Sequence, residues 1–320
     1  KPSAYSPATS AVMKKMIADV FPEEYVTVIE GGREENQNLL SQKFDYIFFT
    51  GGVQVGKMVM EKAAANLTPV TLELGGKSPC IIDKSANLKM TAKRLAFGKY
   101  LNCGQTCVAP DYVLVHEAVK EEFLKLLKSE IRAMYGEDPL KNPDYGKMIN
   151  RKHFDRVLGL MKEEKLILGG ENDTESLRIA PAVMDQVTED DAVMQEEIFG
   201  PLLPILTVGS MEEAIAFVNR RPKPLALYLF TENRETEKNV LEYTSFGGGC
   251  INDTIIHLAT SQMGFGGVGN SGMGSYHGKK SFETFSHEKS IVKKYTWMDL
   301  PMRYQPYTGW KEKLVRMFVK

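Results

Sequence analysis

Short apolar segments rich in β-branched residues alternate with helical segments in the first part of the chain, and this alternation most constrains its fold. Each apolar segment is followed closely by glycines, where a strand can turn into a helix. Strands and helices that alternate at this spacing are typical of βαβ units, which build a parallel sheet. We therefore expect a Rossmann-like start. The expected strands are residues 26–29, 45–49 and 70–74, and the expected helices are residues 8–18 and 53–65.

The alternation continues beyond a soft boundary at Gly75-Gly76. The predicted fold is α/β, with a partial Rossmann-like parallel sheet domain and a second α/β domain. After Phe285 the periodicity weakens, so the predicted divisions are residues 1–74, 75–285 and 286–320. In the second domain the expected strands are residues 80–82, 112–116, 204–208 and 226–230, and the expected helices are residues 87–101, 119–134 and 211–219.

Composition excludes several classes of protein. The 320 residues, 43% of them hydrophobic, suffice for more than one core. Forty basic and 41 acidic side chains give a charge of −1, so no excess charge attracts nucleic acid or an acidic membrane. No segment approaches the ~18 apolar residues of a membrane span, and no signal pattern opens the chain, so we expect a cytoplasmic protein. The four cysteines form no CxxC pair, which predicts neither a metal site nor a disulfide framework: Cys80, Cys103, Cys107 and Cys250.

A glycine turn follows the second expected strand. Thr50, Gly51 and Gly52 stand between that strand and a helix, with Gly56 one turn further on. Backbone N–H groups at such a helix start can approach a pyrophosphate closely. Taken alone, the same glycines fit a tight connection equally well.

A carboxylate occupies the third expected strand, which is otherwise apolar. Glu73 lies near its end, and burial there would raise its pKa towards the range of a general base. The alternative is an ordinary acid that pairs with Lys77 or faces solvent.

Two cysteines lie on one connection between a helix and a strand. Catalytic groups concentrate on such loops, and a thiolate there is a strong nucleophile. A free cysteine is more often a small buried hydrophobe, which is our interpretation of Cys80 and Cys250. Composition alone does not separate Cys103 from Cys107.

In combination, four motifs resemble those of the aldehyde dehydrogenase superfamily, in its order and spacing. They are Phe49-Thr50-Gly51-Gly52, Leu72-Glu73-Leu74-Gly75-Gly76-Lys77, Gly104-Gln105-Thr106-Cys107 and Glu196-Glu197-Ile198-Phe199-Gly200-Pro201. Residues 265–274, continuing to residues 284–287, are similar to the class 3 branch in particular. The resemblance covers essentially the whole chain.

The resemblance implies a role for each matched residue. Cys107 would be the nucleophile, with Cys103 its neighbour, and Glu73 would activate the hydrolytic water. Glu197 would hold the nicotinamide ribose, Phe199 would pack beside the nicotinamide, and Lys1 would reach the adenosine ribose. With NAD or NADP as cofactor, the implied binding residues are Lys1, Thr50, Gly51, Gly52, Gly56, Leu74, Gly75, Glu197 and Phe199.

The implied reaction oxidises an aldehyde, aromatic or medium-chain aliphatic, to its acid. Cys107 attacks the aldehyde carbon, hydride passes to the nicotinamide, and water hydrolyses the resulting thioester. Residues 1–74 would then belong to the NAD(P)-binding domain, residues 75–285 to the catalytic domain, and residues 286–320 to an oligomerisation tail of a homodimer.

The chain departs from the family pattern in two ways. Ala4 stands where the family's Lys-Pro-Ser-Glu motif has its glutamate, so we expect NADP to be tolerated alongside NAD. Family members also carry a segment ahead of this motif that supplies more of the cofactor domain and an oxyanion-hole asparagine. Without it, we expect little turnover from this polypeptide.

Three other interpretations compete with this one. The chain could be a catalytically weak nucleotide-binding fragment, or a coenzyme A-acylating relative, although Glu73 argues for deacylation by water. The C-terminal segment could instead contact a membrane surface, but docking on protein is the favoured interpretation. Its apolar residues at helical spacing are Trp310, Leu314, Val315 and Phe318.

Overall fold

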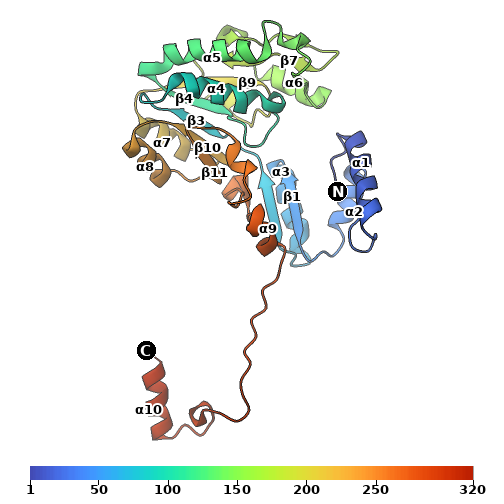
Figure 1. Ribbon diagram of the computed structural model, residues 1–320, viewed down its shortest axis with the longest axis vertical. Helices are drawn as coiled ribbons and strands as arrows, with labels where there is room; N and C mark the ends of the chain where they lie inside the picture. The colour runs from blue at the N-terminus through green and yellow to red at the C-terminus, as the bar shows by residue number, and fades with distance from the viewer. Residues whose placement is uncertain (320) are drawn as a thin grey trace. The chain divides into compact units, whose positions relative to one another are not determined.

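The computed structural model describes residues 1–319, which form two compact units. The first, Lys1–Phe285, contains a small sheet and a large one, and the second begins at Ser286 (Figure 1). In the small sheet the strand order is β1-β2-β12, with β1 and β2 parallel and β12 antiparallel to β2. Its elements and the flanking helices are α1 (Pro7–Val20), α2 (Arg33–Leu40), β1 (Ile47–Gly51), α3 (Val53–Ala64), β2 (Val70–Leu74), β12 (Gly272–Met273) and α9 (Gly278–Thr284).

The large sheet has seven strands in the order β11-β10-β3-β4-β9-β8-β5. All neighbouring strands are parallel except β5, which runs antiparallel to β8. A two-stranded hairpin, β6 with β7, lies outside it. The bounds are β3 (Pro79–Ile82), α4 (Leu88–Tyr100), β4 (Tyr112–His116), α5 (Lys120–Tyr135), α6 (Arg151–Gly159), β5 (Leu166–Leu168), β6 (Asn172–Asp173), β7 (Arg178–Ile179), β8 (Ala182–Met184), β9 (Leu202–Val208), α7 (Met211–Asn219), β10 (Ala226–Phe230), α8 (Arg234–Tyr243) and β11 (Gly248–Ile251).

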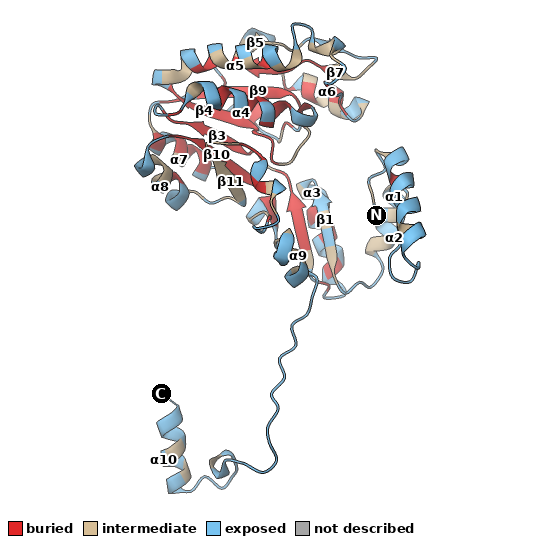
Figure 2. Cartoon of the chain, in the orientation of Figure 1, coloured by how far each residue is buried: buried red, intermediate tan, exposed pale blue. Residues whose placement is uncertain are grey.

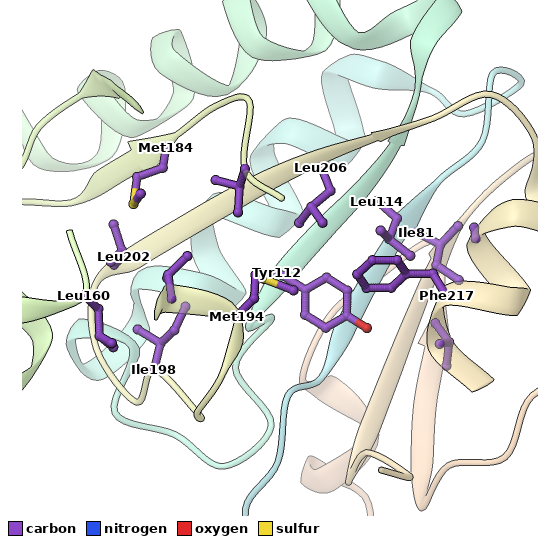
Figure 3. Close-up of a cluster of buried hydrophobic side chains, with 14 of the residues drawn as sticks. Ile81, Tyr112, Leu114, Leu160, Met184, Met194, Ile198, Leu202, Leu206 and Phe217 are labelled. Atoms are coloured by element: carbon purple, nitrogen blue, oxygen red, sulfur yellow. The ribbon is translucent and has the colours of Figure 1, made fainter. Parts of the chain in front are cut away.

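Helices cover both faces of the large sheet, so its inner strands are buried almost throughout, whereas the edge strands β11 and β5 are partly buried (Figure 2). Side chains of a strand alternate between the faces. On β4, Val113 and Val115 pack with α4 and α5, whereas Leu114 packs with α6, α7 and α8. The second of these clusters also contains Ile198, which lies near Leu202 and Met194 in Figure 3. The segment around Ile198 is thereby anchored in the core.

Most of the expected elements are present within three residues of their expected bounds, and the α/β fold is confirmed. The strand expected at residues 26–29 is wrong. Val26 and Ile29 are exposed, and no strand of residues 1–319 pairs with this segment. A β-branched run forms a strand only where a partner satisfies its backbone. The predicted division at residues 74 and 75 stays a prediction.

The tail contains one α-helix, α10 (Gly309–Phe318), where apolar residues recur at helical spacing. Lys320 lies outside the described residues. None of the helices in residues 1–319 is both long and apolar enough to cross a membrane.

Candidate active site

The loop that carries Cys107 begins where α4 ends. Three successive residues adopt left-handed φ angles: Asn102 (52°), Cys103 (55°) and Gly104 (72°). At Gly104 only glycine fits, because a Cβ would overlap the carbonyl oxygen of Gly200. This close approach joins the loop to the segment that contains Glu197.

The two cysteines of this loop have different surroundings. Cys103 is 2% exposed and lies against Gly146, whereas Cys107 is only partly buried. Gln105 anchors the loop between them, since its side chain accepts from the Ile149 N–H at 2.9 Å and donates to the Lys147 carbonyl at 3.0 Å. The accessible thiol is therefore that of Cys107.

Glu73 lies on β2, opposite Thr50 of β1 and Gly272 of β12. It is 4% exposed, and neither carboxylate oxygen has a hydrogen-bond partner among residues 1–319. Burial raises the pKa of Glu73 to about 8. The alternative of an acid paired with Lys77 or exposed to solvent is wrong, because Lys77 has another partner.

That partner is Asp111, at the start of β4. The partly buried Lys77 forms an ion pair with buried Asp111, and the Lys77 amine also donates to the carbonyls of Val193 (2.8 Å) and Glu196 (2.9 Å). The second carboxylate oxygen of Asp111 accepts from the Ile198 N–H at 2.9 Å. This arrangement, the Lys77–Asp111 clamp, fixes the backbone on both sides of Glu197.

Glu197 lies directly against Gly75, where a Cβ would overlap its carboxylate. Burial raises the pKa of Glu197 to about 8, and the charge of Asp111 adds to the effect. The fully buried side chain of Ile198 anchors this segment. The next residue, Phe199, takes a left-handed φ of 43° and is 37% exposed. Strained backbone of this kind clusters at functional sites.

The thiol of Cys107 is close to both carboxyl groups. Burial, together with the smaller effects of the negative charges of Glu197 and Glu73, raises its pKa to about 11. The backbone N–H groups of Cys107 and Val108 act in the opposite direction. The structure thus brings together three residues singled out in the sequence, with the sulfur as a thiol that needs a base.

The remaining predicted cofactor residues, apart from Lys1, lie on the small sheet and α3. Thr50 and Gly51 end β1, next to Glu73 and Leu74 of β2. Gly52 opens α3 and has open space around it. Gly56 packs against Leu74 so closely that a Cβ would overlap that side chain, so packing alone explains its being glycine. The Lys1 amine donates to the carbonyl of Gly31 at 2.7 Å.

A family model for the aldehyde dehydrogenase family matches residues 1–291. The chain belongs to this family. The Staphylococcus aureus 4,4'-diaponeurosporen-aldehyde dehydrogenase is 50% identical over 322 residues, covering 100% of this chain and 70% of that protein. The dimeric NADP-preferring aldehyde dehydrogenase of Canis lupus familiaris is 47% identical over 308 residues, covering 96% of this chain and 68% of that protein.

A solved structure, the substrate-bound state of Staphylococcus aureus AldH, matches with a TM-score of 0.97 and 50% identity, covering 100% of this chain and 70% of that one. Relatives such as these are longer proteins, and the chain spans 61 to 70% of their lengths.

Sequence reasoning missed Asp111 and Lys99. Lys99 is 1% exposed, and this burial lowers its pKa to about 8, although the charge of Asp111 opposes the shift. A signal was present in the helix: Ala92, Leu95 and Ala96 define the buried face of α4, and Lys99 falls on it at helical spacing. No local pattern marks Asp111, whose partners lie 34 and 87 residues away.

The substitution Asp111→Asn tests the Lys77–Asp111 clamp. The amide keeps an acceptor for the Ile198 N–H but leaves the Lys77 ammonium buried without its counter-charge, so we expect the free energy of unfolding to fall by about 3 kcal/mol or more. Urea denaturation measures it. Asp155→Asn, which breaks an exposed pair with Arg151, should change it by less than about 0.5 kcal/mol. Equal effects of both substitutions would contradict the clamp.

The substitution Glu73→Gln tests whether the carboxylate acts on the thiol electrostatically. Removing its negative charge should lower the pKa of Cys107, so that iodoacetamide alkylates this thiol about two- to fivefold faster at pH 9, where Glu73 is otherwise ionised. Peptide mass spectrometry identifies the modified cysteine. Glu164→Gln removes an exposed charge and should leave the rate unchanged. A slower reaction of the Glu73→Gln variant would disprove this electrostatic effect.

Proposed function

We propose that the protein oxidises an aldehyde to the carboxylic acid with NAD or NADP, through a thioester on Cys107. The observation that carries this proposal is that the partly accessible thiol of Cys107 lies within electrostatic reach of Glu73, a buried carboxyl group without a hydrogen-bond partner. A purely structural role gives no reason to bury a carboxyl group without a hydrogen-bond partner.

The first step needs a base, because the pKa of Cys107 lies near 11. Glu73, with a pKa of about 8, accepts the thiol proton far better than an ordinary carboxylate would. The sulfur then forms a bond to the carbonyl carbon, and hydrogen-bond donors stabilise the resulting oxyanion. Collapse of this thiohemiacetal releases hydride and leaves the acyl group on sulfur.

The residues near Cys107 fit a nicotinamide dinucleotide, whose chemistry is to accept that hydride. Glu197 presents a carboxylate beside Gly75, a suitable partner for ribose hydroxyls. The start of α3 at Gly52 is open, which suits a pyrophosphate. Phe199 offers an exposed ring next to Glu197. Lys1 would serve the adenosine ribose.

Deacylation uses Glu73 a second time. An ionised carboxylate in an apolar setting takes a proton from water and directs the hydroxide to the thioester carbon. This step distinguishes hydrolysis from transfer to coenzyme A, for which no such base is required. The proposed substrates are aromatic or medium-chain aliphatic aldehydes, and the proposed assembly is a homodimer, in keeping with the dimeric mammalian relative.

Variants at the cysteines test the function. Joined to the preceding segment that family members carry, the protein should form NADH or NADPH with members of an aldehyde panel, and Cys107→Ser should lower that rate by at least about a thousandfold. Cys250→Ser is the matched control and should retain the rate. Glu73→Gln should lower the rate as well, because this carboxylate accepts the thiol proton and later activates the hydrolytic water. Turnover by Cys107→Ser, or no reduced cofactor with any aldehyde, would refute the proposal.

Ala4 makes cofactor choice a separate test. Because no carboxylate at this position repels a 2′-phosphate, kcat/KM values for NAD and NADP should agree within about tenfold. Ala4→Glu should then disfavour NADP selectively, leaving the value for NAD nearly unchanged. Strict use of NAD by the unsubstituted protein would rule out this explanation of Ala4.

A further inference from the structure

Tyr228 reaches the nucleophile loop from the middle of the large sheet. It is fully buried on β10, in register with Cys80 of β3 and Cys250 of β11. Its hydroxyl donates to the carbonyl oxygen of Val108 at 2.5 Å, a bond between residues 120 positions apart. Val108 directly follows Cys107, so this phenol is hydrogen-bonded to the backbone next to the reacting sulfur.

The backbone on this side of Cys107 is held at several points. The Val108 side chain is fully buried, its carbonyl accepts from Tyr228, and the Ala109 N–H donates to the carbonyl of Thr106 at 3.0 Å. On the other side, Gln105 fixes the loop to residues 147–149. With both sides held, the backbone of residues 106–109 stays fixed beside the Cys107 sulfur, and the backbone N–H groups of Cys107 and Val108 lower the pKa of this thiol.

The ring of Tyr228 is itself fixed. His257 packs edge-on against it, with 5.9 Å between ring centroids and 63° between planes, and its Nδ1 lies 3.5 Å from the Cys250 sulfur. Burial lowers the pKa of His257 to about 4, so it adds no charge at neutral pH. Burial also raises the pKa of Tyr228 well above its usual range, so the phenol keeps the proton that it donates.

We propose that Tyr228 is a positioning residue for Cys107. Its hydroxyl holds the Val108 carbonyl, and through this residue it fixes the backbone that lies beside the sulfur as the thiolate forms. The consequence for catalysis rests on the proposed function of Cys107, whereas the effect on the thiol does not.

The test is the rate at which iodoacetamide alkylates Cys107 between pH 8 and pH 11, with peptide mass spectrometry to separate it from Cys250. Because the pKa of Cys107 lies at about 11, Tyr228→Phe should lower the rate by about tenfold between pH 8 and pH 10, as expected for a thiolate whose pKa is about one unit higher. Glu73, Glu197 and Tyr276 also act on or near this thiol and remain unchanged in the variant.

Tyr100→Phe is the matched control, because it removes a fully buried hydroxyl that donates to the Ala182 carbonyl at 3.0 Å. Its alkylation rate should stay within about twofold of the original, although thermal denaturation should show a comparable loss of stability. Backbone hydrogen exchange at residues 106–109 should rise in Tyr228→Phe alone.

An unchanged alkylation profile in Tyr228→Phe, or an equal change in Tyr100→Phe, would overturn the proposal. Neither outcome depends on aldehyde or cofactor. A protein that alkylates as expected but oxidises no aldehyde would therefore disprove the function and leave the positioning role intact.

Discussion

The ion pair between Lys77 and Asp111 is the interaction on which the site depends. Removing two charges from water is costly, and the cost is offset only where hydrogen bonds complete the arrangement. Here the lysine also binds two backbone carbonyls and the aspartate binds a backbone N–H, all in residues 193–198. The pair therefore serves to position these segments more than to stabilise the protein, because it joins the end of β2, the start of β4 and the segment of Glu197.

Around this ion pair the protein gathers groups that resist ionisation. Glu73 and Glu197 both have pKa values of about 8, and Cys107 has one near 11. Each negative charge that forms makes the next less favourable, so the site holds few charges at once. Protons can then move between sulfur, carboxyl group and water, which is what alternating acid and base steps require.

Much of the fold followed from the sequence because strands buried on both faces and amphipathic helices leave local patterns. The exception at residues 26–29 shows the limit, since a strand also needs a partner that no local pattern reports. At the site, the position of Glu73 near the end of an apolar strand indicated its burial. Composition did not separate Cys103 from Cys107, whereas the resemblance in residues 104–107 favoured Cys107, and the fold shows that Cys103 lies buried against Gly146. The bonds of Asp111 and Tyr228 cross 34 to 120 residues, a range that periodicity does not reach.

Those long sequence separations also bear on the order of events during folding. Bonds between distant residues form late, because the chain must lose the entropy of closing large loops before they contribute. The hydroxyl of Tyr228 can reach Val108 only after β10 has joined β3, and Lys77 can bind Glu196, 119 positions away, only after the chain between them has been enclosed. A nascent or partly folded chain therefore lacks the arrangement around Cys107, and the environment of that thiol reports on the completion of the tertiary structure.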